Sequence, residues 1–112
     1  MYYLQIISLD NCPYSMAANK LVNTNTINSK ITQVNHETKE NFKSKYITTF
    51  PQVYLKKQNS TGSVLLGGYE ELQYYFDLVK NNRNIDSLKD TIKKNNKNLS
   101  DKATLRLIQL LI

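Results

Sequence analysis

Apolar and polar residues alternate along the chain in a pattern that predicts a strand, a tight turn and a helix at the start. Residues 2–8 are rich in tyrosine, isoleucine and leucine, which favour strands. After the turn at Cys12, apolar residues in the segment 16–22 recur at three- and four-residue spacing, which is typical of one helical face. Pro13 suits the first helical position, where an amide hydrogen is not needed.

The middle of the chain predicts further strands and one short helix. Residues 31–35 form a plausible second strand, and Thr38 begins a short helix that runs through Phe42 and Tyr46. Two apolar runs, at residues 52–55 and 64–66, flank the loop sequence Asn59-Ser60-Thr61-Gly62. This arrangement predicts an antiparallel hairpin.

Three helices are expected in the last third. The first covers residues 70–80, and its inner face is formed by Leu72, Tyr75, Phe76 and Val79. The second covers residues 85–94, with Ile85, Leu88 and Ile92 on one face. The last is capped by Ser100 and has Leu105, Ile108, Leu111 and Ile112 on one face. The order predicts an α/β fold with a mixed four-stranded sheet flanked by helices. Residues 1–94 form the expected domain, and residues 95–112 form a helical extension packed on it. The alternative is that the apolar face of the extension binds a partner.

Length and composition fit one globular domain. The chain has 112 residues, 40% of them hydrophobic, and no apolar run approaches a membrane span of about 20 residues. We expect no signal peptide and no membrane partner. Cys12 is the only cysteine, so no internal disulfide forms and a reducing, cytoplasmic setting is expected. A monomer is the simplest assembly.

The formal net charge of +6 raises the question of nucleic-acid binding. The lysines are scattered, however, and pairs such as Lys56-Lys57 and Lys93-Lys94 do not build a stripe. A solvated lysine-rich surface without nucleic acid is therefore the better interpretation. His36 has no cysteine or second histidine nearby, so no metal site is expected.

Three short segments suggest chemistry. Amides at a helix N-terminus stabilise anions, so a thiol at Cys12 is expected to be acidic and nucleophilic, unless it is simply a small buried apolar residue. Pro51 cannot donate a ladder hydrogen bond at the entry to a strand. A cis Phe50–Pro51 peptide would explain a proline at this position and would turn the backbone of Phe50 toward a ligand. An ordinary trans proline is the alternative. Gly67-Gly68 would let a ligand approach the amides of the next helix; a plain turn is the alternative.

Together these segments resemble the glutaredoxin family. Cys12-Pro13-Tyr14-Ser15, Thr49-Phe50-Pro51 and Gly67-Gly68-Tyr69-Glu70-Glu71 match in order the family's Cys-Pro-Tyr-Cys, Thr-Val-Pro and Gly-Gly-X-Asp-Asp motifs. The resemblance covers residues 1 to about 94. It implies a thioredoxin fold and glutathione as cosubstrate. It also implies that Cys12 is the nucleophile and that Tyr14, Thr49, Phe50, Pro51, Gly68, Tyr69 and Glu70 bind glutathione.

The chain departs from the family pattern at three positions. Ser15 replaces the second cysteine, so an intramolecular disulfide is impossible. Leu9 stands where the family often has a lysine, and Lys43 or Lys45 would have to serve the glycyl carboxylate instead. Glu70 replaces an aspartate but keeps its charge.

The resemblance implies a single-thiol reaction in which Cys12 reduces mixed disulfides between glutathione and proteins or small molecules. Two alternatives stay open. One is a carrier of a [2Fe–2S] cluster held between two chains and two glutathiones, although the Cys-Gly-Phe-Ser sequence of dedicated carriers is absent. The other is a non-catalytic binding protein that has kept the fold.

Overall fold

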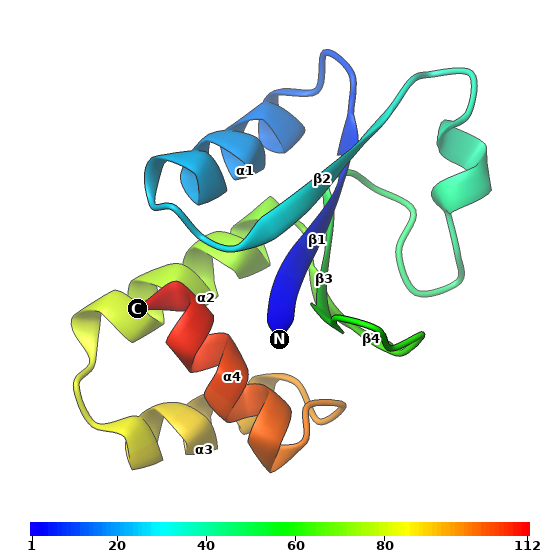
Figure 1. The fold of residues 1–112 in the computed structure, drawn as a ribbon. Coiled ribbons are helices and arrows are strands. Elements are labelled where there is room, and N and C mark those ends of the chain that lie inside the picture. Colours follow the sequence, from blue (N-terminus) through cyan, green and yellow to red (C-terminus); the bar gives the residue numbers. More distant parts are fainter.

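The fold is built on a four-stranded mixed sheet with the strand order β2-β1-β3-β4 (Figure 1). The computed structural model describes residues 1–112, and its strands are β1 (Tyr2–Leu9), β2 (Ser29–Val34), β3 (Gln52–Lys57) and β4 (Ser63–Gly67). β1 pairs in parallel with β2 and antiparallel with β3. β3 and β4 form the predicted antiparallel hairpin. The α/β class is confirmed, and the topology is compatible with a thioredoxin-like fold that carries an extra C-terminal helix.

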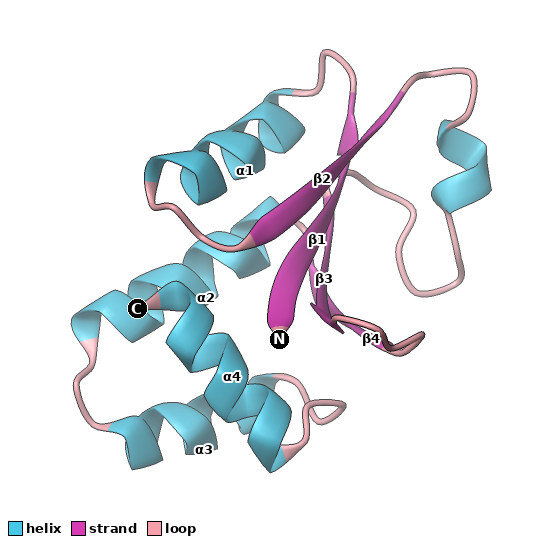
Figure 2. Cartoon of the chain, in the orientation of Figure 1, coloured by secondary structure: helices cyan, strands magenta, loops and turns pink.

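The helices are unequally distributed over the two faces of this sheet (Figure 2). One face is covered by α1 (Pro13–Thr24), α2 (Tyr69–Asn81) and α4 (Asp101–Leu111), and α3 (Ile85–Asn95) packs against α2 and α4. The other face carries only the 3₁₀ turn η1 (Lys39–Phe42). The side-chain amide of Gln52, on that face of β3, donates to the Phe42 carbonyl at 2.8 Å and anchors the turn.

The hydrophobic core lies between the sheet and its helix-covered face. Alternate residues of β1 and β3 point into it, because successive strand side chains face opposite sides. Nineteen buried residues form one cluster, which spans residues before and after position 94, among them Leu4, Leu55, Leu72, Leu88, Ile92, Leu99, Leu107 and Ile108. The C-terminal helix α4 therefore packs into the same core as the rest of the chain. No helix combines the length and apolar character needed to cross a bilayer.

The segment after η1 is not helical as far as Tyr46. Lys43 already has an extended backbone, and the Ser44 hydroxyl accepts the amide hydrogens of Tyr46 and Ile47 at 3.1 and 3.3 Å. Such side-chain bonds to nearby amides compete with helical ones. The predicted helix therefore ends at Phe42.

The faces of the last two helices also differ from prediction. Ile85 is 47% exposed and Ile112 is 72% exposed, because they lie at the first residue of α3 and just after α4, where few neighbours can cover them. Leu105 is half-buried. The buried face of α4 is formed instead by Ala103, Thr104, Leu107, Ile108 and Leu111. The helix is thus rotated relative to the face that we expected.

Candidate functional site

Cys12 lies in a tight turn between β1 and α1. Asn11 adopts a positive φ of 57°, which its short polar side chain tolerates better than most residues do. The Cys12 amide donates to the Leu9 carbonyl at 3.3 Å, which closes the turn. Cys12 is the extended N-cap residue of α1, and Pro13 occupies the first turn of the helix as predicted. The half-buried thiol therefore sits at the start of a twelve-residue helix.

The end of β2 holds this turn in place. The Asp10 amide donates to the Val34 carbonyl at 2.9 Å, and the Gln33 side chain donates to the Asp10 carboxylate at 2.7 Å. Nε2 of the exposed His36 donates to the Asp10 carbonyl at 3.2 Å. His36 thus braces the turn that presents Cys12 and has no other polar contact.

Ser15, three residues after Cys12, faces away from solvent. It is fully buried, and its Oγ accepts the amide hydrogen of Leu9 at 3.0 Å. This bond joins the first turn of α1 to the last residue of β1. The hydroxyl therefore satisfies a backbone group that the turn at Cys12 would otherwise leave unpaired.

The segment leading into β3 lies directly against the thiol. The Phe50–Pro51 peptide is cis, as expected. Cys12 Sγ lies 3.8 Å from the Phe50 carbonyl oxygen, a distance at which the thiol is a weak donor. Pro51 is buried, whereas Thr49 is exposed and Phe50 is half-buried.

A groove of about 300 Å³ opens at this point between three segments that are far apart in the sequence. Tyr14 from α1, Thr49 and Phe50 before β3, and the start of α2 line it; the α2 residues are Gly68, Tyr69, Glu70 and Glu71. All predicted glutathione-binding residues except Pro51 therefore line one groove. Pro51 lies buried behind it, with its carbonyl 3.5 Å from the position that a Cβ on Gly68 would take.

Two tyrosines form one wall of the groove. The ring centroids of Tyr14 and Tyr69 lie 6.3 Å apart, with the ring planes tilted by 37°. The Tyr69 hydroxyl donates to the Gln73 side chain at 3.0 Å, which fixes that ring, whereas Tyr14 is 59% exposed. The wall thus combines one fixed ring with one that is free to move.

Glu71 is a groove residue that the sequence-based set of binding residues did not include. Its Oε1 accepts the Gly68 amide hydrogen at 2.7 Å. Gly67 permits this, since its φ is 132° and a Cβ there would lie 2.5 Å from the Glu71 oxygen. A glutamate three residues after a helix N-cap is a known capping signal and was available in the sequence. The bond occupies the Gly68 amide, in the segment whose amides we expected a ligand to approach.

The groove is acidic at the end formed by the start of α2. Glu70 and Glu71 are exposed carboxylates, and no lysine or arginine lines the groove. Lys43 is paired with Glu40 at 2.9 Å, and the Lys45 ammonium lies 5.0 Å from the Tyr46 ring centroid. Neither lysine that we considered for the glycyl carboxylate therefore lines the groove.

No protein-family model and no curated protein matches the chain. A half-exposed thiol lies at a helix N-terminus, beside a groove with free backbone groups at one side and carboxylates at its end. The arrangement places a thiol close to a groove whose carboxylates can attract a cationic group.

Proposed function

We propose that the protein is a glutathione-dependent thiol–disulfide oxidoreductase of the glutaredoxin type, with Cys12 as its nucleophile. One observation carries the proposal. The groove of about 300 Å³ is assembled from three separate segments, and these are the segments whose motifs resemble the family. Cys12 is not itself a lining residue, but its sulfur lies 3.8 Å from the carbonyl oxygen of the lining residue Phe50. A chance resemblance of three short motifs would not require them to meet next to the same cysteine.

The proposed ligand lies along the groove in an extended form. The backbone of Phe50 pairs with the cysteinyl part of glutathione, whose sulfur then lies next to Cys12. The Glu70 carboxylate receives the ammonium of the γ-glutamyl end, and the amide of Tyr69 at the start of α2 receives its carboxylate. Thr49 and Tyr14 line the sides.

The reaction proceeds in two exchange steps that conserve sulfur–sulfur bonds. The Cys12 thiolate attacks the glutathione sulfur of a mixed disulfide; the bond to the substrate sulfur breaks, and the substrate leaves as a thiolate that takes up a proton. Cys12 now carries glutathione. The thiolate of a second glutathione attacks that sulfur, which releases glutathione disulfide and restores Cys12. In sum, one glutathione is oxidised for each substrate thiol that is freed.

Ser15 requires the second glutathione to act as the resolving thiol. A hydroxyl cannot form a disulfide, and the Ser15 oxygen is engaged by the Leu9 amide. The substrates are therefore glutathionylated proteins or small-molecule mixed disulfides rather than disulfides within proteins. A single free cysteine and a need for reduced glutathione suit the cytoplasm.

The test is reduction of a glutathionylated peptide by glutathione, with glutathione disulfide formation followed through a coupled reductase. The wild-type protein is expected to accelerate the reaction and Cys12→Ser is expected to abolish that acceleration. Met16→Ser, at an exposed position of the same helix, is the matched control and should retain activity. Activity in Cys12→Ser equal to that of the wild type would refute the proposal.

A further inference from the structure

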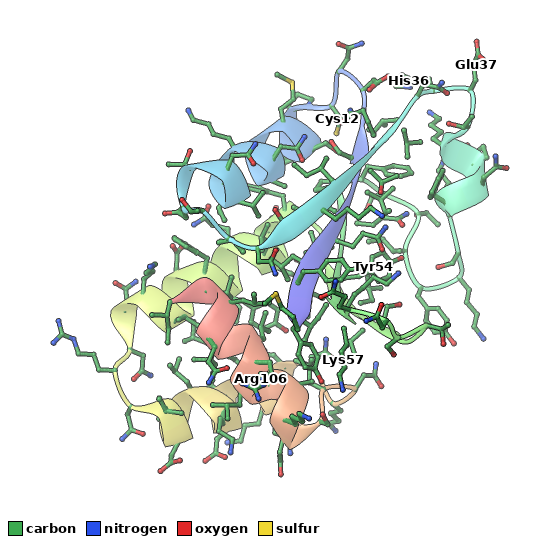
Figure 3. All side chains as sticks on the ribbon, in the orientation of Figure 1. Cys12, His36, Glu37, Tyr54, Lys57 and Arg106 are labelled. Carbon is green, nitrogen blue, oxygen red and sulfur yellow. The ribbon has the colours of Figure 1, made fainter.

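A second cavity lies at the opposite end of the molecule from Cys12. It has a volume of about 440 Å³. It is lined by Tyr2 and Lys57 from the sheet, by Met1 just before β1, and by Lys102, Arg106, Gln109 and Leu110 from α4. Cys12 lies at one end of β1, and Lys57 and Arg106 lie at the other (Figure 3). Eight strand residues separate the two ends, which at about 3.3 Å per residue is roughly 25 Å. The cavity is therefore independent of the thiol site.

The fold brings the cationic residues of this cavity together from distant parts of the chain. Lys57 pairs with Tyr2 in the antiparallel register of β3 and β1, so both side chains point to the helix-covered face. Lys102 and Arg106 are one helical turn apart on α4, and Gln109 follows on the same flank. Because α4 packs against β1, the two sets face one cavity.

None of the three cations has an acidic partner. The two ion pairs of the chain are Lys43–Glu40 and Lys93–Asp101. Asp101, which precedes Lys102, is thus engaged elsewhere, and its hydrogen bond with Lys93 holds the pKa of the Asp101 carboxyl below its usual range. No carboxylate lines the cavity. Three positive charges therefore converge on it without compensation.

Arg106 is held in position for a ligand. Its Nη1 donates to the Gln109 side-chain oxygen at 2.9 Å, which restrains the guanidinium while its remaining N–H groups have no partner within the chain. A guanidinium with free N–H groups offers paired donors that match two oxygens of one phosphate. The half-buried Tyr2 and Leu110 supply an apolar wall beside it.

We propose that this cavity binds an oligophosphate, either free or as the tail of a nucleotide. A ligand with two or more phosphate groups matches three cations in number, whereas a single carboxylate would leave most of the charge unpaired. The volume lies in the range of small-molecule sites, about 300–1,000 Å³. The cations are confined to one cavity and do not form a stripe, which favours a compact anion over a nucleic-acid strand.

Calorimetric titration of the full chain with sodium tripolyphosphate, ATP and inorganic phosphate tests the proposal. We expect saturable one-to-one binding of tripolyphosphate or ATP, weaker at high salt, and much weaker binding of phosphate. Arg106→Gln should lower the affinity about tenfold, the size of one charge-assisted contact. Arg83→Gln, which removes the other arginine of the chain from the exposed turn after α2, is the matched control and should change the affinity less than twofold.

The same titrations identify the source of the phosphates. Equal affinity for tripolyphosphate and ATP indicates a free oligophosphate. Tighter binding of ATP that is lost in Tyr2→Leu indicates a nucleotide whose base contacts the tyrosine ring. The proposal would be overturned if neither tripolyphosphate nor ATP bound saturably. It would also be overturned if Arg106→Gln and Arg83→Gln, both folded by circular dichroism, lost affinity equally. A single-stranded oligonucleotide that binds more tightly than tripolyphosphate and ATP would overturn it as well.

Discussion

The Glu71 carboxylate accepts the Gly68 amide hydrogen at 2.7 Å, at the point where a ligand carboxylate is expected to bind. Glu70, the preceding residue, lines the same groove. In the proposed complex the two neighbours act in opposite directions. Glu70 attracts the ammonium of glutathione, whereas Glu71 repels its carboxylate and keeps the Gly68 amide occupied.

Glu70→Gln and Glu71→Gln should therefore change glutathione affinity with opposite signs. Loss of the exposed Glu70 charge weakens binding about two- to fivefold. Glu71→Gln keeps an oxygen that caps Gly68 but removes the repelling charge, so binding strengthens about two- to fivefold at low salt. Calorimetry with S-methylglutathione, which cannot react, measures both. Effects of the same sign would contradict the opposite roles of the two residues, and unchanged affinity in both variants would show that neither residue contacts the γ-glutamyl end.

Ser15→Ala should destabilise the fold. The Leu9 amide would lose its partner in a buried position, at a cost of about 1–3 kcal/mol in the free energy of unfolding. Urea unfolding measures this cost. Ser87→Ala, on the exposed surface of α3, is the control and should stay within about 0.5 kcal/mol of the wild type. A neutral Ser15→Ala would mean that water reaches the Leu9 amide.

Gly67→Ala should damage both stability and the groove. At φ 132° an alanine is strained, and its Cβ would lie 2.5–2.8 Å from atoms of the Glu71 side chain, which must move. We expect a loss of about 1–3 kcal/mol and reduced activity. Gly62→Ala in the β3–β4 loop meets nothing closer than 3.8 Å and should be tolerated. Thermal unfolding and the coupled assay compare the two variants.

Leu107→Ala tests how α4 is attached. Leu107 is fully buried in the common core, so the substitution should cost about 2–5 kcal/mol. Leu105→Ala, at a half-buried position, should lower the free energy of unfolding by roughly 1 kcal/mol. Urea unfolding followed by circular dichroism measures the loss in each variant. If the costs were reversed, α4 would pack through the face that the sequence pattern predicts.

Local patterns predicted the sheet and its hairpin, and the resemblance of three motifs implied that their segments meet near Cys12. These features depend on strand-forming runs, on turn residues such as Asn59 to Gly62, and on motifs whose order is visible in the chain. The cis Phe50–Pro51 peptide was one of two possibilities, because a proline at a strand entry does not by itself exclude a trans bond.

Features that depend on how helices and strands pack against one another were not predictable from local patterns. The spacing of apolar residues on α4 suits either Leu105 or Leu107 facing inward, and only its packing on α3, α2 and β1 decides between them. Lys57 and Arg106 meet for the same reason, although the sequence suggests only scattered charge. Ser44 ended a predicted helix through side-chain bonds that compete with the helical pattern.

The most direct test is the intact mass of the protein after a single turnover with a glutathionylated peptide and no free glutathione. Our account predicts that the wild type acquires one glutathione on Cys12 and releases the peptide as a free thiol, and that Cys12→Ser acquires nothing. Added glutathione then removes the adduct as glutathione disulfide. A protein that carries the peptide instead, or an even mixture of both adducts, would show that the groove does not select glutathione and would contradict the account.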